Sequence, residues 1–117
     1  MHNSQRGKKG EDLAADTLVK NGMEIITRNY RSKYGEIDII ALDSGIIVFV
    51  EVKAWLVFGL EDLQYSINTG KQRKIIKTAK YFLLENRKYS NMPIRFDVVF
   101  ISNNSVTHLA SAFMERV

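Results

Sequence analysis

Two acidic residues near one end of a predicted β-hairpin have the types and spacing of a metal-dependent hydrolytic site. Two β-branched runs, residues 36–42 and 46–53, flank a short polar turn, a pattern typical of a hairpin. With Ser44-Gly45 as the loop, counting outward from the turn places Asp38 opposite Glu51. Cross-strand partners have Cβ atoms about 4.5–5.5 Å apart, so two carboxylates there repel each other unless a proton or a cation lies between them.

A lysine completes this group. Lys53 stands two residues after Glu51 and points to the same face of the strand, and the same register places it opposite Glu36. Carboxylates suit Mg²⁺, Mn²⁺ or Ca²⁺, a lysine can orient water or hold a phosphate oxygen, and the Val52 carbonyl is within reach. The group predicts metal-assisted phosphodiester hydrolysis. Alternatively, Lys53 only neutralises Glu51 or Glu36, and a one-residue register slip would separate Asp38 from Glu51.

The rest of the chain predicts the elements that hold this hairpin. In order, the sequence predicts a helix over 5–21, a strand over 23–30, the hairpin, an apolar loop over 55–66, a helix over 70–88, a strand over 94–102 and a short strand or turn over 106–117. This order predicts an α/β fold, a mixed central sheet flanked by helices. At 117 residues we expect a single domain spanning residues 1–117.

Two polar residues fall on the inward sides of the predicted helices. Glu11 lies on the apolar stripe of the first helix, with Ala14 and Leu18, and an inward carboxylate needs a partner. A first-turn acid favoured by the helix dipole is the plainer interpretation. Gln72 lies on the inner edge of the second long helix, three residues before Ile75.

Composition narrows the chemistry and suggests a partner. The chain has no cysteine and only two distant histidines, His2 and His108, so any metal would be held by carboxylates. Net charge is +4, and residues 71–88 carry seven basic residues against one acid. Such a stripe indicates a polyanion partner, although a solvated helix face is an equal alternative. With no long apolar run and no signal sequence, we expect a soluble cytoplasmic protein without membrane contact.

The order of these motifs resembles that of the YraN family of small bacterial proteins. The resemblance runs from Gly7 to about Phe113 and rests on the following segments: Gly10-Glu11-Asp12-Leu13-Ala14, Arg28-Asn29-Tyr30-Arg31, Gly35-Glu36-Ile37-Asp38-Ile39-Ile40-Ala41, Val48-Phe49-Val50-Glu51-Val52-Lys53, Lys71-Gln72-Arg73-Lys74-Ile75 and Arg95-Phe96-Asp97-Val98-Val99. That family is similar to the PD-(D/E)XK nucleases, particularly to archaeal Holliday-junction resolvases. Ala54-Trp55 departs from the pattern, because the family commonly has an arginine there.

The resemblance implies a restriction-endonuclease-like core and a set of site residues. By position, Asp38, Glu51 and Lys53 match the catalytic residues. Glu11, Asp38, Glu51 and the Val52 carbonyl would bind Mg²⁺ or Mn²⁺. Gln72, which matches a polar residue that reaches toward the site, and Glu36 are predicted to support it. The phosphate backbone would be contacted by Lys71, Arg73, Lys74, Lys77 and Arg95.

Three functions remain open at this point. The first is a metal-dependent nuclease acting on DNA, selective for branched or junction structures and possessing a homodimer contact in the apolar stretch 55–60. The second is a nucleic-acid-binding module of the same fold that does not cut. The third is an interaction protein in which the acidic cluster is only structural.

Overall fold

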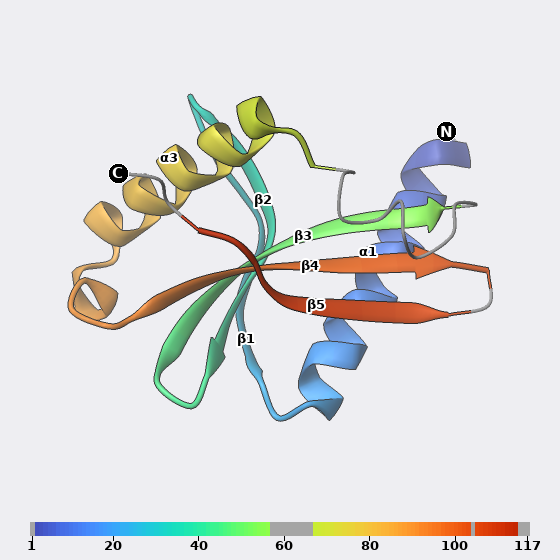
Figure 1. The fold of residues 1–117 in the computed structure, drawn as a ribbon, viewed down its shortest axis with the longest axis horizontal. Helices are drawn as coiled ribbons and strands as arrows, with labels where there is room; N and C mark the ends of the chain where they lie inside the picture. The colour runs from blue at the N-terminus through green and yellow to red at the C-terminus, as the bar shows by residue number, and fades with distance from the viewer. Residues whose placement is uncertain (1, 57–66, 104, 115–117) are drawn as a thin grey trace.

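The computed structural model describes residues 2–56, 67–103 and 105–114, which form two long helices, a five-stranded sheet and one 3₁₀ turn (Figure 1). In chain order these elements are α1 (His2–Lys20), β1 (Glu24–Ser32), β2 (Gly35–Asp43), β3 (Ile46–Leu56), α3 (Thr69–Glu85), η1 (Arg87–Tyr89), β4 (Ile94–Ser102) and β5 (Val106–Phe113). The predicted order of elements is confirmed.

The sheet is mixed, as predicted. Its strands lie in the order β1-β2-β3-β4-β5, and every neighbouring pair is antiparallel except β3 and β4, which are parallel. Short turns permit the antiparallel neighbours, whereas a parallel pair requires a long crossover, which here contains α3. The result is an α/β fold compatible with a restriction-endonuclease-like core.

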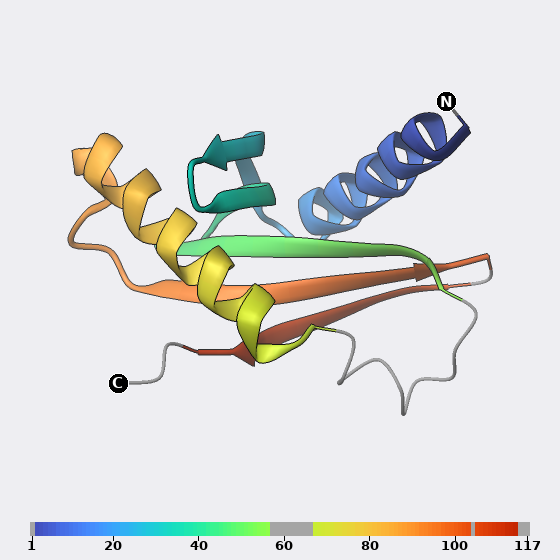
Figure 2. The same cartoon turned by 90° about the horizontal axis from the view of Figure 1, so that it is seen from above.

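The two helices lie on opposite faces of the sheet (Figures 1 and 2). On one face α1 packs Ala14 and Leu18 against Val48 and Val50 of β3, among others. On the other face α3 packs Ile75, Ala79 and Phe82, among others, against Ile47 and Phe49 of β3. These two residues alternate along the strand with the two that face α1. Glu51 continues the second series, so the strand directs it to the α3 face.

The β2–β3 turn is as predicted. Ser44 and Gly45 both have positive φ angles, 50° and 86°, as a two-residue type I′ turn requires. Asp43 then pairs with Ile46, and the register continues without a shift to Ile39 opposite Val50.

The predicted backbone pairs beyond that point do not form. The paired register of β2 and β3 stops at Ile39 and Val50, so Asp38 does not pair with Glu51, whereas β3 remains paired with β4. The Asp38 side chain bridges the two strands instead, because its carboxylate accepts a hydrogen bond from the Val52 N–H at 2.7 Å.

Glu36 is turned to the other neighbour of β2. It pairs with Arg31 of β1 in register, and their side chains form an ion pair of 3.0 Å. The predicted pairing of Glu36 with Lys53 is therefore wrong. The physical reason is that β1 follows β2 to its very end, at Gly35, whereas β3 does not.

The ends of two other predicted elements are also different. β3 continues to Leu56, so the predicted loop over 55–66 begins as strand, and residues 57–66, with most of the proposed dimer contact, lie outside the described residues. The predicted helix over 70–88 ends at Glu85 and is followed by the 3₁₀ turn η1. Within the described ranges, no helix is long and apolar enough to cross a membrane.

Candidate active site

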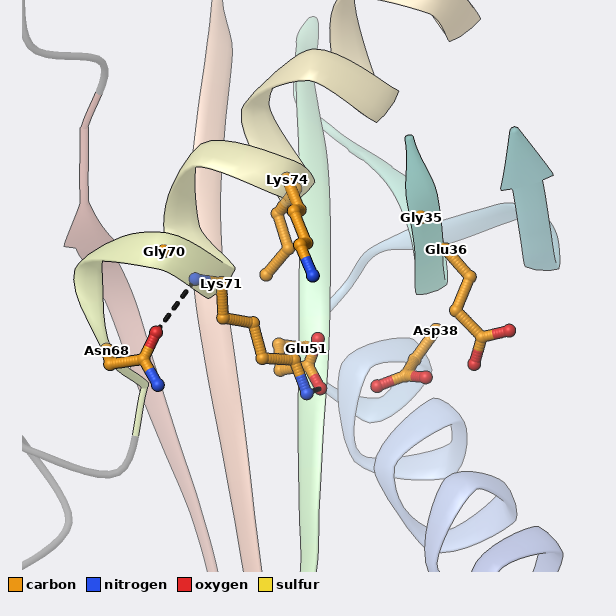
Figure 3. A pocket seen from close by; sticks show the side chains of 9 residues that line it. Gly35, Glu36, Asp38, Glu51, Asn68, Gly70, Lys71 and Lys74 are labelled. Atoms are coloured by element: carbon orange, nitrogen blue, oxygen red, sulfur yellow. Dashed lines mark hydrogen bonds and ion pairs between the residues drawn. The ribbon is translucent and has the colours of Figure 1, made fainter. Parts of the chain in front are cut away.

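A pocket of about 410 Å³ opens between the start of α3 and the ends of β2 and β3 that lie beside it (Figure 3). Acidic residues from the sheet and basic residues from the helix face each other across it. Its lining consists of Gly35, Glu36, Asp38, Glu51, Asn68, Gly70, Lys71, Lys74 and Ile75. Thus two of the three predicted catalytic residues, Asp38 and Glu51, share one cavity although they are not paired in the backbone.

Asp38 carries the clearest electrostatic signature in the pocket. Burial, followed by the nearby Glu51 carboxylate, raises the pKa of Asp38 to about 7, and the hydrogen bond from Val52 offsets only part of this. A carboxyl group in such surroundings gains from any cation or proton that approaches it. Groups of this kind, in a cleft and with a charged partner, are candidates for functional sites.

Glu51 forms an ion pair with Lys71, which the sequence analysis had predicted to contact a phosphate backbone. Its side chain is 8% exposed, and its Oε1 lies 3.0 Å from Nζ of Lys71. Burial works against the charge on Lys71, but the ion pair with Glu51 outweighs burial and raises the pKa of Lys71. Lys71, predicted as a contact to a phosphate backbone, therefore reaches into the pocket itself (Figure 3).

Lys53 lies beside this ion pair. Burial and the neighbouring Lys71 ammonium lower the pKa of Lys53, although Glu51 and Asp38 act in the opposite direction. Two lysines and two carboxylates thus interact at one end of β3, close to the start of α3. This arrangement retains the predicted association of acid, acid and lysine and adds a second lysine.

The donor set permits a magnesium ion but offers few protein ligands. Among the described residues, no three acidic, histidine or cysteine side chains are grouped closely enough to hold a metal. Asp38 and Glu51 supply two carboxylates, and the Val52 carbonyl lies on the same strand edge as the N–H that binds Asp38. Mg²⁺ commonly keeps several waters and takes one or two protein carboxylates together with substrate phosphates, so these residues fit it.

Glu11 is not brought into the pocket. It forms an ion pair of 2.9 Å with Arg28, accepts a hydrogen bond from Asn29, and lines a separate cavity between α1 and β1. Its charge contributes to the raised pKa of Asp38, but less than burial or Glu51. The partner that Glu11 was expected to need is Arg28 of β1, which the helical pattern alone did not identify.

Gln72 also points away from the pocket. Its amide donates to the Ile67 carbonyl at 3.0 Å, and its side chain lines a small cavity against β4 and β5. Glu36 does line the carboxylate pocket, yet it is engaged with Arg31. Of the two residues predicted to support the site, only Glu36 is therefore close to it.

Arg95 is bound in a network at the opposite end of β3. Two of its nitrogens lie 2.9 and 3.0 Å from the carboxylate of Asp97, and a third lies 3.1 Å from Asp43. Asp97 is completely buried and also bonds His108 at 2.7 Å and the Ser111 N–H at 2.9 Å. Burial opposes the charge on Asp97, but these bonds prevail and lower its pKa. Arg95 is thus placed to neutralise a buried acid.

The remaining predicted contacts with a phosphate backbone lie on α3. Arg73, Lys74 and Lys77 are exposed, and Lys74 also borders the pocket. The start of the helix is fixed by Asn68, whose side chain accepts a hydrogen bond from the Lys71 N–H at 2.8 Å (Figure 3). Sequence reasoning did not assign Asn68 to the pocket, although an asparagine just before a predicted helix is a recognisable N-cap signal.

The fold and site define a small α/β protein in which carboxylates and lysines share one cleft at the sheet. Comparison with known sequences identifies its family. The model of a family described as "Uncharacterised protein family UPF0102" matches residues 10–101. The chain belongs to this family, and the identification with the YraN family made from its motifs is confirmed.

Relatives from distant bacteria match over nearly their whole length. A UPF0102 protein of Treponema denticola is 46% identical over an alignment of 121 positions, and the alignment covers 92% of this chain and 93% of the relative. One from Persephonella marina is also 46% identical, with 92% of each chain covered. A UPF0102 protein of Clostridioides difficile is 39% identical and covers 97% of this chain and 100% of the relative.

Proposed function

We propose that this protein is a metal-dependent endonuclease that hydrolyses DNA phosphodiesters and selects branched or junction structures. The observation that carries the proposal is the grouping of Asp38 and Glu51 with Lys71 and Lys74 in one open pocket, with Lys53 beside it. Opposite charges on the two walls suit a ligand that is itself anionic and arrives with a cation.

Asp38, Glu51 and the Val52 carbonyl would hold Mg²⁺ or Mn²⁺, which when bound supplies Lewis-acid stabilisation and an acidified water. The raised pKa of Asp38 supports this assignment, because a group strained by a neighbouring carboxylate is stabilised by a cation. Glu11 takes no direct part in this proposal, since it is engaged by Arg28.

Lys53 would orient the attacking water and stabilise the charge that develops on the phosphoryl oxygens. Its position supports this role, because Lys53, whose pKa is lowered by burial and by the Lys71 ammonium, lies within the same charged cluster as Glu51 and Asp38. Lys71 would leave Glu51 when a metal arrives and would then be free to contact a phosphate oxygen.

Arg73, Lys74 and Lys77 supply the wider attraction for the polyanion, as exposed cations on the helix that borders the pocket. Contacts of this type bind the backbone and carry no sequence information. A substrate recognised by its shape, such as a flap or four-way junction, follows from that. Symmetrical cutting of a junction would require a homodimer.

A non-catalytic nucleic-acid-binding module of the same fold is the second candidate. It is favoured by the ion pair between Lys71 and Glu51, because the pocket neutralises its most buried acid without a metal. Such a module would bind DNA through the same basic face and would not depend on Asp38 or Lys53.

Cleavage of a substrate panel tests the proposal. The panel holds single-stranded, duplex, flap and four-way-junction DNA and one RNA, in Mg²⁺ and in Mn²⁺, with Lys53→Ala and Lys88→Ala purified identically. Lys88 is an exposed lysine of η1, beyond the end of α3, so it serves as the matched control. We expect cutting by wild type and Lys88→Ala and its loss in Lys53→Ala. Salt-dependent binding without cutting in any protein would establish the binding module instead.

A further inference from the structure

The turn between β1 and β2 places an exposed tyrosine beside the pocket. Tyr34 is 39% exposed and directly precedes Gly35, which lines the pocket. Exposed turns commonly carry small or polar residues, and within the described part of the chain the Tyr34 ring packs against no other aromatic ring. Part of the Tyr34 side chain is therefore open to solvent.

The turn is fixed in place rather than free. The Tyr34 N–H donates to the Ser32 hydroxyl at 3.0 Å, and that hydroxyl in turn contacts the Thr78 hydroxyl of α3 at 3.3 Å. Thr78 is fully buried, and Gly35 packs beside α3, where a Cβ on it would make ordinary contacts of 3.6 Å with Lys74 and Thr78. The backbone at Tyr34 is thus anchored to α3 beside the pocket, so the turn itself needs little ordering when a ligand binds.

Two lysines surround this ring. Nζ of Lys33 lies 5.3 Å and Nζ of Lys77 lies 5.9 Å from its centroid, within the range of cation–π attraction. Both side chains are exposed, so their ammonium groups can move from the ring to a phosphate when a base approaches. Single-stranded nucleic acids are bound by aromatic rings on which bases stack together with basic side chains that contact phosphates, and Tyr34 with its two lysines combines both.

We propose that Tyr34 is a stacking platform for an unpaired base of the nucleic acid that enters the pocket, with Lys33 and Lys77 holding the flanking phosphates. This inference rests on the proposed function, whose substrate class it narrows. In continuous duplex both faces of a base are covered by its neighbours, so a fixed external ring gains a partner only where a strand is unpaired. The chain is therefore selective for a single-stranded segment beside the bond that occupies the pocket.

Binding to short labelled DNA, in EDTA so that no cleavage occurs, tests this directly. The probes are an oligonucleotide of about 15 nucleotides and its duplex, followed by fluorescence anisotropy. Tyr34→Leu should weaken single-strand binding roughly tenfold, the effect of one stacked base, and should change duplex binding less than about twofold. Tyr34→Phe, which keeps the ring, should bind as wild type does. An RNA strand of the same sequence should show the same Tyr34 dependence.

Tyr81→Leu is the matched control. Tyr81 is 38% exposed and lies on α3 seven residues beyond Lys74, about 10 Å farther from the pocket along the helix. It should leave both affinities unchanged. As a second readout, 2-aminopurine in the single strand should be quenched by wild type and by Tyr34→Phe, and not by Tyr34→Leu. Thermal unfolding of each variant confirms that the fold is intact.

The outcomes separate this inference from the nuclease proposal. Equal single-strand affinities for wild type and Tyr34→Leu, or an equal loss on single strand and duplex, would overturn the platform. A Tyr34-dependent preference for single strand in a protein that never cuts would uphold the platform and overturn the nuclease. Cleavage by a protein with no Tyr34-dependent preference for single strand would uphold the nuclease and overturn the platform.

Discussion

Replacement of Asp38 by asparagine should stabilise the protein, and the effect should depend on pH. The side chain is half-buried, and burial together with Glu51 raises its pKa to about 7. Asparagine has nearly the same shape, and its amide oxygen can still accept the hydrogen bond from the Val52 N–H. The substitution therefore removes the charge and retains the contact that joins β2 to β3.

Proton linkage gives the direction in which the free energy of unfolding changes with pH. The ordinary pKa of an aspartate is 3.8, so between about pH 4 and pH 7 the unfolded chain has released a proton that the folded protein still holds. Wild-type stability should fall as pH rises through this window and level off above about pH 7. Three pKa units correspond to about 4 kcal/mol as an upper limit, and solvent access to the pocket reduces the expected loss to about 2 kcal/mol.

Urea unfolding at about pH 5 and about pH 8, in EDTA, measures this difference. The stabilisation of Asp38→Asn over wild type should be at least about 1 kcal/mol larger at the higher pH. Glu36→Gln is the control, because this carboxylate lines the same pocket but is 48% exposed and paired with Arg31, and its effect should not change in this way. Parallel pH profiles of stability for wild type and Asp38→Asn would show that the pKa of Asp38 is not raised in the folded protein.

Three further predictions concern other parts of the molecule. Asp97→Asn should cost about 3 kcal/mol in urea unfolding, because it removes the buried charge that pairs Arg95; a loss below about 1 kcal/mol would contradict the network. Gly35→Ala should lower stability by about 1 kcal/mol or more in scanning calorimetry, because φ is +151°, and an unchanged melting temperature would argue against that conformation. Lys71→Met should tighten Mn²⁺ binding several-fold in calorimetric titration, because it frees Glu51. Unchanged or weaker binding would show that Lys71 and the metal do not compete for Glu51.

Local pattern was sufficient to predict most of the fold. The β-branched runs around Ser44-Gly45 predict a hairpin with a defined register because the turn leaves only one pairing, and that register is observed up to Ile39 and Val50. The apolar face of α3 likewise follows from the helical period of 3.6 residues. These features depend on neighbours in sequence.

The arrangement of the site depends on distant parts of the chain and was only partly predictable. The register counted outward from the turn does not show where β3 separates from β2. The hydrogen bond between Asp38 and the Val52 N–H was therefore not predicted. The position of Lys71 on Glu51 depends on how α3 crosses the sheet. Glu11 was correctly expected to need a partner, but its position does not reveal that Arg28 supplies it.

A single-turnover cleavage rate tests whether the pocket around Asp38 and Glu51 is a nuclease site. The rate of cleavage of a flap DNA in Mg²⁺ is measured with excess wild-type protein and with excess Asp38→Asn, and DNA affinity is measured alongside. We expect cutting by wild type and a rate at least about a hundredfold lower for Asp38→Asn, with DNA affinity retained. Equal rates for the two proteins, or no cutting of bound DNA by wild type, would contradict this expectation.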